Sequence, residues 1–486
     1  MATDITQFPR FTYLPVGQDV IFTVSNNDVI TNTDFINVKF IAEVHISSGE
    51  LVNLSNNNDV VGTFKTTPNN AGVGIFNFRP IIESFVNADN KARANSSYKT
   101  IENTNLTTPI HLIDKYSGND NSFRWFAVQF KIEYVDNDSA SATFGDLITT
   151  NYANSDSFKL FNGYLKYTDE LLLGIGTESN NFGFNTGIFN LENTERKLLT
   201  NAPSTQYANI DDYGTSAILM LNPLTNIQQV PFTTTLGTAM IRFTYYEEDG
   251  TLIDFETIRL DDPNNGGFDY ADRGFAYNKL MFAGVFPANL RGWSTKFNTN
   301  IDDISYYTFV VQTLTPSVAD NISQTYRVNI NCPTLKGYAP IRLTWLNQWG
   351  AWDYYTFTKK SVKSISTSKS TYNQLQGTWN EKFYQINGYK GGKKNFRVNA
   401  VEKITINTDF VSETETEWFE ELINSTEVYV VNSFDDIPDA ATITNKYIEP
   451  VRLTTSSYTK KTIANDKLIQ YTFEVEKSKT QRTQSV

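Results

Sequence analysis

The amino-acid sequence predicts a mainly β fold, built from several β-sandwich-like domains with a few short helices. Aromatic residues make up 14% of the 486-residue chain, and Thr, Asn, Val and Ile are abundant. Aromatic and β-branched side chains favour strands, and Asn favours the polar turns between strands. Long periodic stretches of Ala, Leu, Glu and Lys, which would indicate helical bundles, are nearly absent. A chain of this length exceeds what a single core accommodates, so we expect more than one domain.

We expect three domains. Residues 1–157 would form an N-terminal β-sandwich-like domain, because strand-forming runs there alternate with Asn- and Asp-containing turns up to a polar stretch at 136–157. Residues 158–335 would form a central β domain. Residues 336–486 would form a C-terminal β domain with one helix, at about 413–424, and a flexible tail.

Two elements stand out in the expected N-terminal domain. Pro80 suits the first turn of a short helix, where its missing N–H costs nothing, and Ile81 and Ile82 follow it as part of an apolar face. The segment Phe123–Tyr134 then alternates apolar and mostly polar side chains, which predicts a strand buried on one side.

The clearest element of the central region is a hairpin. Its strands are Ile241–Tyr246 and Thr251–Phe255, joined at Asp249-Gly250, a dipeptide that favours tight hairpin turns. The following segment, 261–273, is rich in Asp, Asn and Gly and is predicted to be a loop. Its oxygen ligands could hold a calcium ion, but the spacing departs from the EF-hand pattern, so a plain turn is favoured.

A second hairpin concentrates aromatic side chains. Runs Ile341–Leu346 and Asp353–Phe357 meet at a short turn around Gly350. Rings in such numbers supply a large buried or contact area with little side-chain freedom to lose. The candidate core or interface aromatics are Trp345, Trp349, Trp352, Tyr354 and Tyr355.

The C-terminal region contains the one convincing helix signal. Ser412 and Glu415 form a capping box ahead of the segment Glu413–Asn424, in which apolar residues occupy neighbouring helical positions. Alternating strand patterns follow, and the basic, polar tail from Lys477 is expected to fray in isolation. The candidate residues of this assembly tail are Lys477, Lys479 and Arg482.

Charge and cysteine content exclude several function classes. The net charge of −12 argues against sequence-independent nucleic-acid binding, although DNA could pass close to such a surface. Cys332 is the single cysteine, so no disulfide or multi-cysteine metal site can form within the chain. The sequence contains neither a secretion signal nor an apolar run long enough to span a membrane. We therefore expect assembly in a host cytoplasm and no membrane partner.

Candidate catalytic residues are few. The only histidines are His45 and His111, and no nucleophile elbow, zinc-protease motif, phosphate loop or dinucleotide-binding pattern accompanies them. We therefore predict no enzyme activity, no cofactor and no metal. The run GYKGGKK at 388–394 lacks the strand–loop–helix setting of a phosphate loop and is interpreted as an exposed hairpin tip.

Three stretches carry a resemblance to a known type of protein. They are GVGIFNFRPIIESFV (72–86), RLTWLNQWGAWDYYTF (342–357), and ETEWFEELINSTEVYVVN (415–432) with the later IEPVRLTTSSYTKK (448–461). Together they resemble virion structural proteins of tailed phages of Bacteroidetes-like hosts, including the crAss-like group. The resemblance implies β-sandwich building blocks of the tail, such as collar rings, hubs or baseplate parts, and it brings no active-site residues with it.

The predicted function is therefore structural. We expect a component of a tailed-phage virion, a tail or collar ring or a tail hub, that forms a homo-oligomeric ring. Its partners would be other copies of itself and neighbouring tail, collar or portal proteins. The alternative is a glycan-binding or glycan-degrading tail fibre or receptor-binding protein, because carboxylate pairs cannot be ruled out from sequence and aromatic rings suit sugar stacking. A bacterial surface adhesin is a third, weaker alternative, because the sequence has no secretion signal.

Overall fold

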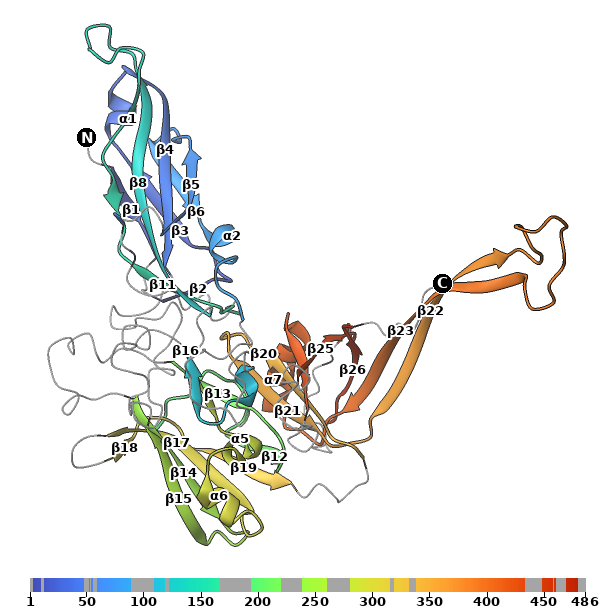
Figure 1. Ribbon diagram of the computed structural model, residues 1–486. Coiled ribbons are helices and arrows are strands. Elements are labelled where there is room, and N and C mark those ends of the chain that lie inside the picture. Colours follow the sequence, from blue (N-terminus) through green and yellow to red (C-terminus); the bar gives the residue numbers. More distant parts are fainter. Residues whose placement is uncertain are drawn as a thin grey trace. The chain divides into compact units, whose positions relative to one another are not determined.

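The structure is a computed structural model that confirms the mainly β fold, with several separate sheets and a few short helices (Figure 1). It describes residues 3–9, 13–47, 52, 54–55, 59–88, 109–118, 122–166, 194–219, 238–259, 280–314, 319–331, 338–432, 448–457, 459 and 469–479. The oxygen-rich loop 261–273, Cys332 and Arg482 lie outside these residues.

The chain forms two compact units. Unit 1 includes Met1–Ile330 and Leu346–Asp353, and unit 2 includes Asn331–Trp345, Tyr354–Pro438 and Asn445–Val486. The aromatic hairpin therefore divides, with its turn in unit 1 and its strands mostly in unit 2. The finer division into domains at 1–157, 158–335 and 336–486 stays a prediction.

Unit 1 begins with two sheets that face each other as a sandwich. The first sheet has the order β1 (Asp4–Gln7), β3 (Ile21–Ser25), β6 (Val73–Asn77). The second has the order β2 (Tyr13–Pro15), β11 (Phe158–Phe161), β8 (Phe123–Asp136), β4 (Phe35–Ser47), β5 (Val60–Thr66), with β9 (Leu147–Thr149) and β10 (Ala153–Asn154) paired to β8. Helices α1 (Asp28–Thr31) and α2 (Arg79–Ile82) pack on this sandwich, whereas the 3-10 turn η2 (Ile110–Leu112) contacts β13 (Thr215–Leu219) and β16 (Leu280–Gly284).

The core of this sandwich is aromatic. Phe22 of β3 lies 5.7 Å from Phe130 and 6.2 Å from Phe126, both on β8. Phe76 of β6 contacts the same Phe130 ring at 5.6 Å. The predicted alternation along β8 is confirmed, because Phe126 and Phe130 are fully buried in one core cluster. The predicted helical turn at Pro80 is also confirmed, since Pro80 occupies the start of α2.

The described residues of unit 1 form two further sheets. One has the order β12 (Thr205–Asn209), β19 (Tyr326–Asn331), β17 (Tyr306–Leu314), β14 (Thr238–Tyr246), β15 (Leu252–Arg259), with β18 (Ala319–Asn321) paired to β17. The other has the order β13 (Thr215–Leu219), β16 (Leu280–Gly284), β7 (Tyr116–Gly118). Helices α5 (Pro287–Arg291) and α6 (Thr295–Thr299) lie beside the larger sheet, where Phe297 packs 5.6 Å from Tyr245. The predicted β14–β15 hairpin is confirmed, with Gly250 at a φ of 90° in its turn.

In the part of unit 2 that the structure describes, the chain forms one seven-stranded sheet and one helix. The strand order is β21 (Trp352–Phe357), β20 (Ile341–Leu346), β24 (Val428–Val431), β25 (Ile448–Leu453), β26 (Thr472–Lys477), β23 (Gly392–Asn407), β22 (Val362–Gln374). Helix α7 (Glu413–Asn424) begins with the predicted capping box between Ser412 and Glu415. Its Trp418 and Phe419 are buried against the sheet, which fixes the helix to the core.

A buried lysine makes the stability of unit 1 depend on pH. Lys159 of β11 is 8% exposed, with its Nζ 4.8 Å from the centre of the Trp125 ring. Burial lowers the pKa of Lys159 to about 8, whereas an unfolded lysine keeps its proton up to about pH 10.4. Folding therefore releases a proton between these values, and the free energy of unfolding rises with pH across that window.

We expect Lys159→Met to unfold with a higher free energy than the parent at neutral pH, by about 1–3 kcal/mol. Its stability should also rise less than that of the parent above about pH 8, because methionine has no proton to release. Denaturant unfolding of both proteins at neutral pH and at about pH 9.5 measures the difference. Identical pH slopes would show that Lys159 keeps its charge at no cost in the folded chain.

Candidate functional site

The aromatic hairpin has a well-defined turn. The amide of Asn347 donates to the carbonyl of Ala351 at 2.8 Å, and its own side chain accepts from the amides of Trp349 and Ala351. Gly350 has a φ of 74°, as its position in a tight turn requires. The predicted hairpin is confirmed, with strands β20 and β21 at the expected positions.

The five candidate aromatics lie in or against the interior. In unit 2, Trp345 is fully buried 5.0 Å from Trp418, and half-buried Tyr355 lies 4.9 Å from Phe419. The remaining three, Trp349, Trp352 and Tyr354, are 2% to 5% exposed. These side chains therefore contribute to cores. An interface role for them stays a prediction.

Both histidines are buried. His45 of β4 has its Nε2 3.1 Å from the Oε1 of Gln129, and the ring of His111 meets Trp352 edge-on at 4.9 Å. The two imidazoles are 1% and 0% exposed. Each ring is enclosed by neighbouring side chains, as expected for a histidine with a structural role. The prediction that the chain is not an enzyme stays a prediction.

Lys477 was predicted in a frayed assembly tail, and this placement is wrong. Lys477 is the last residue of β26, and its Nζ lies 3.2 Å from Glu402 and 3.1 Å from Glu449 of the same chain. Burial acts to lower the pKa of Lys477, but the hydrogen bonds and charges of the two carboxylates outweigh it and raise the pKa. The strand extends to Lys477 because its alternating apolar side chains continue up to this ion pair. Lys479 lies beyond the strand and is exposed.

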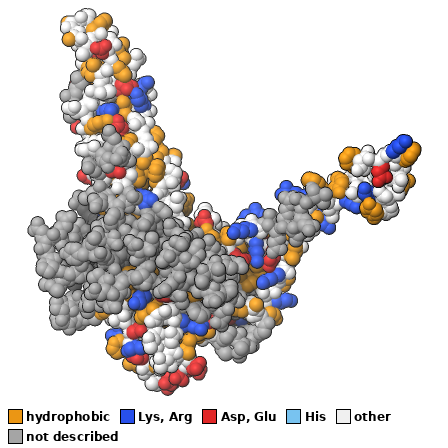
Figure 2. Space-filling view, viewed as in Figure 1, with side chains coloured by type: hydrophobic (Ala, Val, Ile, Leu, Met, Phe, Trp, Pro, Cys, Tyr) orange, Lys and Arg blue, Asp and Glu red, His pale blue; other side chains and the backbone are white. Residues whose placement is uncertain are grey.

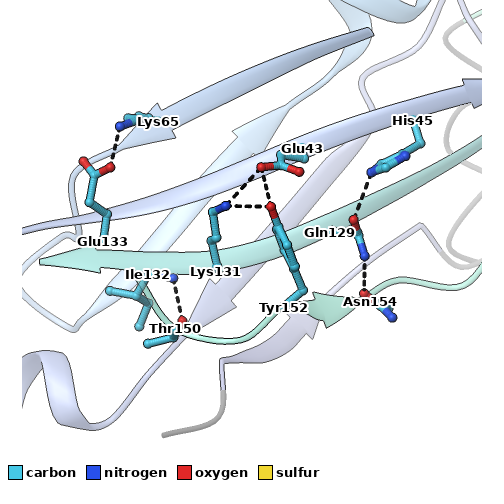
Figure 3. Close-up of polar contacts among 10 residues, drawn as sticks. All are labelled: Glu43, His45, Lys65, Gln129, Lys131, Ile132, Glu133, Thr150, Tyr152 and Asn154. Carbon is cyan, nitrogen blue, oxygen red and sulfur yellow. Dashed lines mark hydrogen bonds and ion pairs between the residues drawn. The ribbon is translucent and has the colours of Figure 1, made fainter. Parts of the chain in front are cut away.

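A polar cluster covers the outer face of β4, β5 and β8 (Figure 3). Glu43 accepts from the hydroxyl of Tyr152 at 2.5 Å and from Lys131 at 3.1 Å. Lys131 also donates to the Tyr152 hydroxyl at 2.6 Å. Next to it, Lys65 and Glu133 form an ion pair at 2.6 Å. Cross-strand pairs of this kind are the usual way in which a solvent-facing sheet surface is stabilised.

The pKa values of the three titratable groups in this cluster are shifted away from neutral pH. Burial acts to raise the pKa of Glu43, but hydrogen bonds from Tyr152 and Lys131 outweigh it and lower the pKa. The carboxylate in turn raises the pKa of Lys131 against the effect of burial. Burial and Glu43 both raise the pKa of Tyr152. Acid–base catalysis needs a group whose pKa lies near the working pH, so these contacts stabilise the sheet surface and are not poised for proton transfer.

The most unusual surface belongs to the hairpin of β22 and β23. Its strands pair with each other from Val362↔Thr405 to Gln374↔Gly392, whereas β26 pairs with β23 only from Lys403 to Asn407. Residues 366–401 therefore extend beyond the sheet as a two-stranded projection, which we call the arm (Figure 1). Gly377 is its only buried residue.

The end of the arm, residues 375–391, which we call the tip, is an ordered turn. The amide of Thr378 donates to the carbonyl of Gln385 at 3.0 Å, and the amide of Asn387 donates to the carbonyl of Gln376 at 3.1 Å. A Cβ at Gly377 would lie 2.6 Å from the backbone carbonyl oxygen of Gln385, so glycine is needed for that close approach. The tip thus holds its side chains in a defined arrangement on the outside of the molecule.

Apolar and basic side chains cover the tip together. Trp379 is 83% exposed and Tyr389 is 77% exposed. The other large exposed apolar residues of the tip are Leu375, Phe383, Tyr384 and Ile386. Figure 2 shows hydrophobic and Lys or Arg side chains next to one another at the end of the arm. Large apolar side chains exposed together in this way mark an interaction surface.

The sequence predicted only part of this site. The run GYKGGKK was correctly interpreted as part of an exposed hairpin end, since Gly388–Lys394 spans the end of the tip and the start of β23. The aromatic residues just before it, from Trp379 to Tyr384, were missed as a site. The signal that could have found them is the Ser- and Thr-rich segment 361–374, which contains too few apolar residues to bury either face.

Comparison with known proteins identifies no family. No family model matches the sequence, and no curated protein matches it. A solved structure titled biofilm associated protein, BSP domain, is 11% identical with a TM-score of 0.15, over 84% of this chain and 63% of that one. Trypsin-activated alpha-2-macroglobulin from Escherichia coli is 9% identical with a TM-score of 0.13, over 84% of this chain and 40% of that one. The chain thus spans less than two thirds of either structure.

Two further properties of the described residues bear on the site. Among these residues, no group of three or more His, Cys, Asp or Glu side chains is placed to hold a metal ion. The same part of the chain contains no helix with the length and apolar character needed to cross a membrane.

Proposed function

We propose that this protein is a structural subunit of a tailed-phage virion, in which copies of the chain form a closed tail or collar ring. The observation that carries the proposal is the arm, a projection of 36 residues that buries only Gly377 in the isolated chain. A two-stranded hairpin is marginally stable in water by itself. An arm of this length would gain its stability from a surface outside its own sheet.

Several features support an assembly role over a catalytic one. The polar groups in the cluster around Glu43 are paired with one another, and both histidines are packed inside unit 1. A group of exposed apolar side chains lies at the tip of the arm, where it suits contact with a protein surface. The resemblance of three sequence stretches to tailed-phage virion proteins supports a place in a phage virion. Identical subunits joined through two different surfaces form rings when the rotation between them closes.

One observation favours the alternative, a glycan-binding tail fibre or receptor-binding protein. Trp379 and Tyr389 present exposed rings of the kind that stack on sugars. The two functions would place the protein at different positions in the virion. A receptor-binding protein lies at the outer end of a fibre, whereas ring subunits surround the tail axis.

A reconstruction of the virion that contains this chain tests the proposed function. We expect several copies related by rotation about the tail axis, each with its arm in contact with a neighbour. The same map would identify the neighbouring tail, collar or portal proteins. Finding the chain as a monomeric decoration, or as a trimeric fibre away from the axis, would contradict the ring.

A further inference from the structure

We propose that the arm of one copy docks through its tip on an acidic surface of a second copy. This inference rests on the proposed homo-oligomeric function and names the contact that would build it. The contact joins two different surfaces of the same chain, arm to body, so each copy offers one arm and accepts another. Contacts of that kind give rings or open chains, whereas a self-complementary contact gives a closed pair.

Charge is divided unequally along this chain. Residues 366–401 contain six Lys or Arg and one Glu, a net charge of +5. Because the whole chain carries −12, the rest of it carries −17. The basic residues of the arm are Lys369, Lys382, Lys390, Lys393, Lys394 and Arg397. A basic arm on an acidic body is complementary to another copy of the same body.

The chemistry of the tip favours a protein over a nucleic acid or an anionic membrane. The tip combines exposed aromatic rings with basic side chains next to them, which suits a protein surface that offers both apolar area and negative charge. Trp379 and Phe383 provide the apolar part, and Lys382 and Lys390 lie beside exposed rings. A body with a charge of −17 repels phosphate-rich surfaces and attracts the arm of another copy.

Unit 1 offers one acidic surface of the required kind. The β14–β15 turn exposes Glu247, Glu248 and Asp249. The segment with Asp302 and Asp303, also exposed, lies next to it, because the amide of Ser305 donates to the carbonyl of Tyr246 at 3.0 Å.

Apolar surface accompanies these charges. Leu252 begins β15 directly after the turn and is 54% exposed. This surface therefore combines negative charge with apolar area, as the tip combines positive charge with apolar area.

Charge reversal in two separate variants tests the docking. The arm variant carries Lys390→Glu, Lys393→Glu and Lys394→Glu, and the body variant carries Glu247→Lys, Glu248→Lys and Asp249→Lys. We expect each variant alone to associate at least about tenfold more weakly than the parent. We expect an equal mixture of the two to regain association, because each altered arm then meets an altered body and each native arm meets a native body.

Sedimentation velocity over a range of protein concentrations, at low and high salt, measures association, and thermal melts confirm that each variant folds. The matched control is Lys39→Glu, Lys197→Glu and Lys360→Glu, which changes the net charge as much as the arm variant does, at exposed sites away from the arm. It should associate like the parent.

The two proposals fail in different ways. A parent protein that stays monomeric in solution and forms no ring in the virion map contradicts the proposed function itself. A parent that assembles while the arm variant assembles equally well contradicts the docking alone. A mixture that fails to regain association overturns this acceptor surface. Binding of the arm to anionic lipid vesicles or to nucleic acid, with no association between copies, would assign it a different partner.

Discussion

Replacing Trp345 with alanine is expected to lower the free energy of unfolding of unit 2 by about 3–5 kcal/mol. Trp345 is fully buried in β20, with its ring 5.0 Å from Trp418 and 6.3 Å from Phe419 of α7. Alanine would remove the side chain that joins the helix to the sheet and would leave a cavity that neighbouring groups fill only in part. The loss combines transfer free energy with the cost of that cavity.

Guanidinium unfolding of Trp345→Ala, followed by circular dichroism, measures this loss. The matched control is Trp379→Ala, which removes the same ring from a side chain that is 83% exposed at the tip. Its free energy of unfolding should stay within about 0.5 kcal/mol of the parent. If the two variants unfold alike, Trp345 does not have the packing role that the structure gives it.

The second large effect is expected at Gly350 in the turn of the aromatic hairpin. Its φ of 74° is unfavourable for any residue with a side chain, and a Cβ there would lie 2.1 Å from the carbonyl oxygen of Asn162. That neighbour is backbone and cannot rotate away. We expect Gly350→Ala to destabilise unit 1 by about 2–4 kcal/mol, because conformational strain and a steric clash act together.

Gly388→Ala is the control for this substitution, since a Cβ at Gly388 would meet nothing within 4 Å. Thermal melts of the two alanine variants separate the effect of the site from the effect of the residue type. A Gly350→Ala protein that melts with the parent would mean that the turn relaxes away from Asn162 at little cost.

Local signals in the sequence were enough to predict several elements. The capping box at Ser412 and Glu415 depends on residues three positions apart, and helix α7 begins there. The alternation of apolar and polar side chains along β8 predicts one buried face. The turn at Gly250 requires a positive φ, which glycine adopts easily. In each case the deciding interactions lie within a few residues of one another. Such interactions can be inferred without knowledge of the rest of the fold.

The remaining features depend on contacts between distant segments. Lys477 could not be placed in β26, because its carboxylate partners Glu402 and Glu449 are distant in the sequence. In the group around Glu43, that residue of β4 meets Lys131 of β8, 88 positions later, and Tyr152 of a following loop, 109 positions later. The arm gave no periodic signal, since a strand exposed on both faces has no hydrophobic side. Its existence follows from the pairing of β22 with β23, and no local rule determines that register.

The outer edge of β22 has a consequence for how copies of this protein could aggregate. β22 ends the seven-stranded sheet, so the backbone along its outer side is available to pair with another strand. Lys363 and Lys369 place positive charge on this edge strand. Like charges on an edge oppose the stacking of identical strands into fibrils. We therefore expect these lysines to oppose edge-to-edge pairing, and with it amyloid-like growth, in a concentrated solution of this protein.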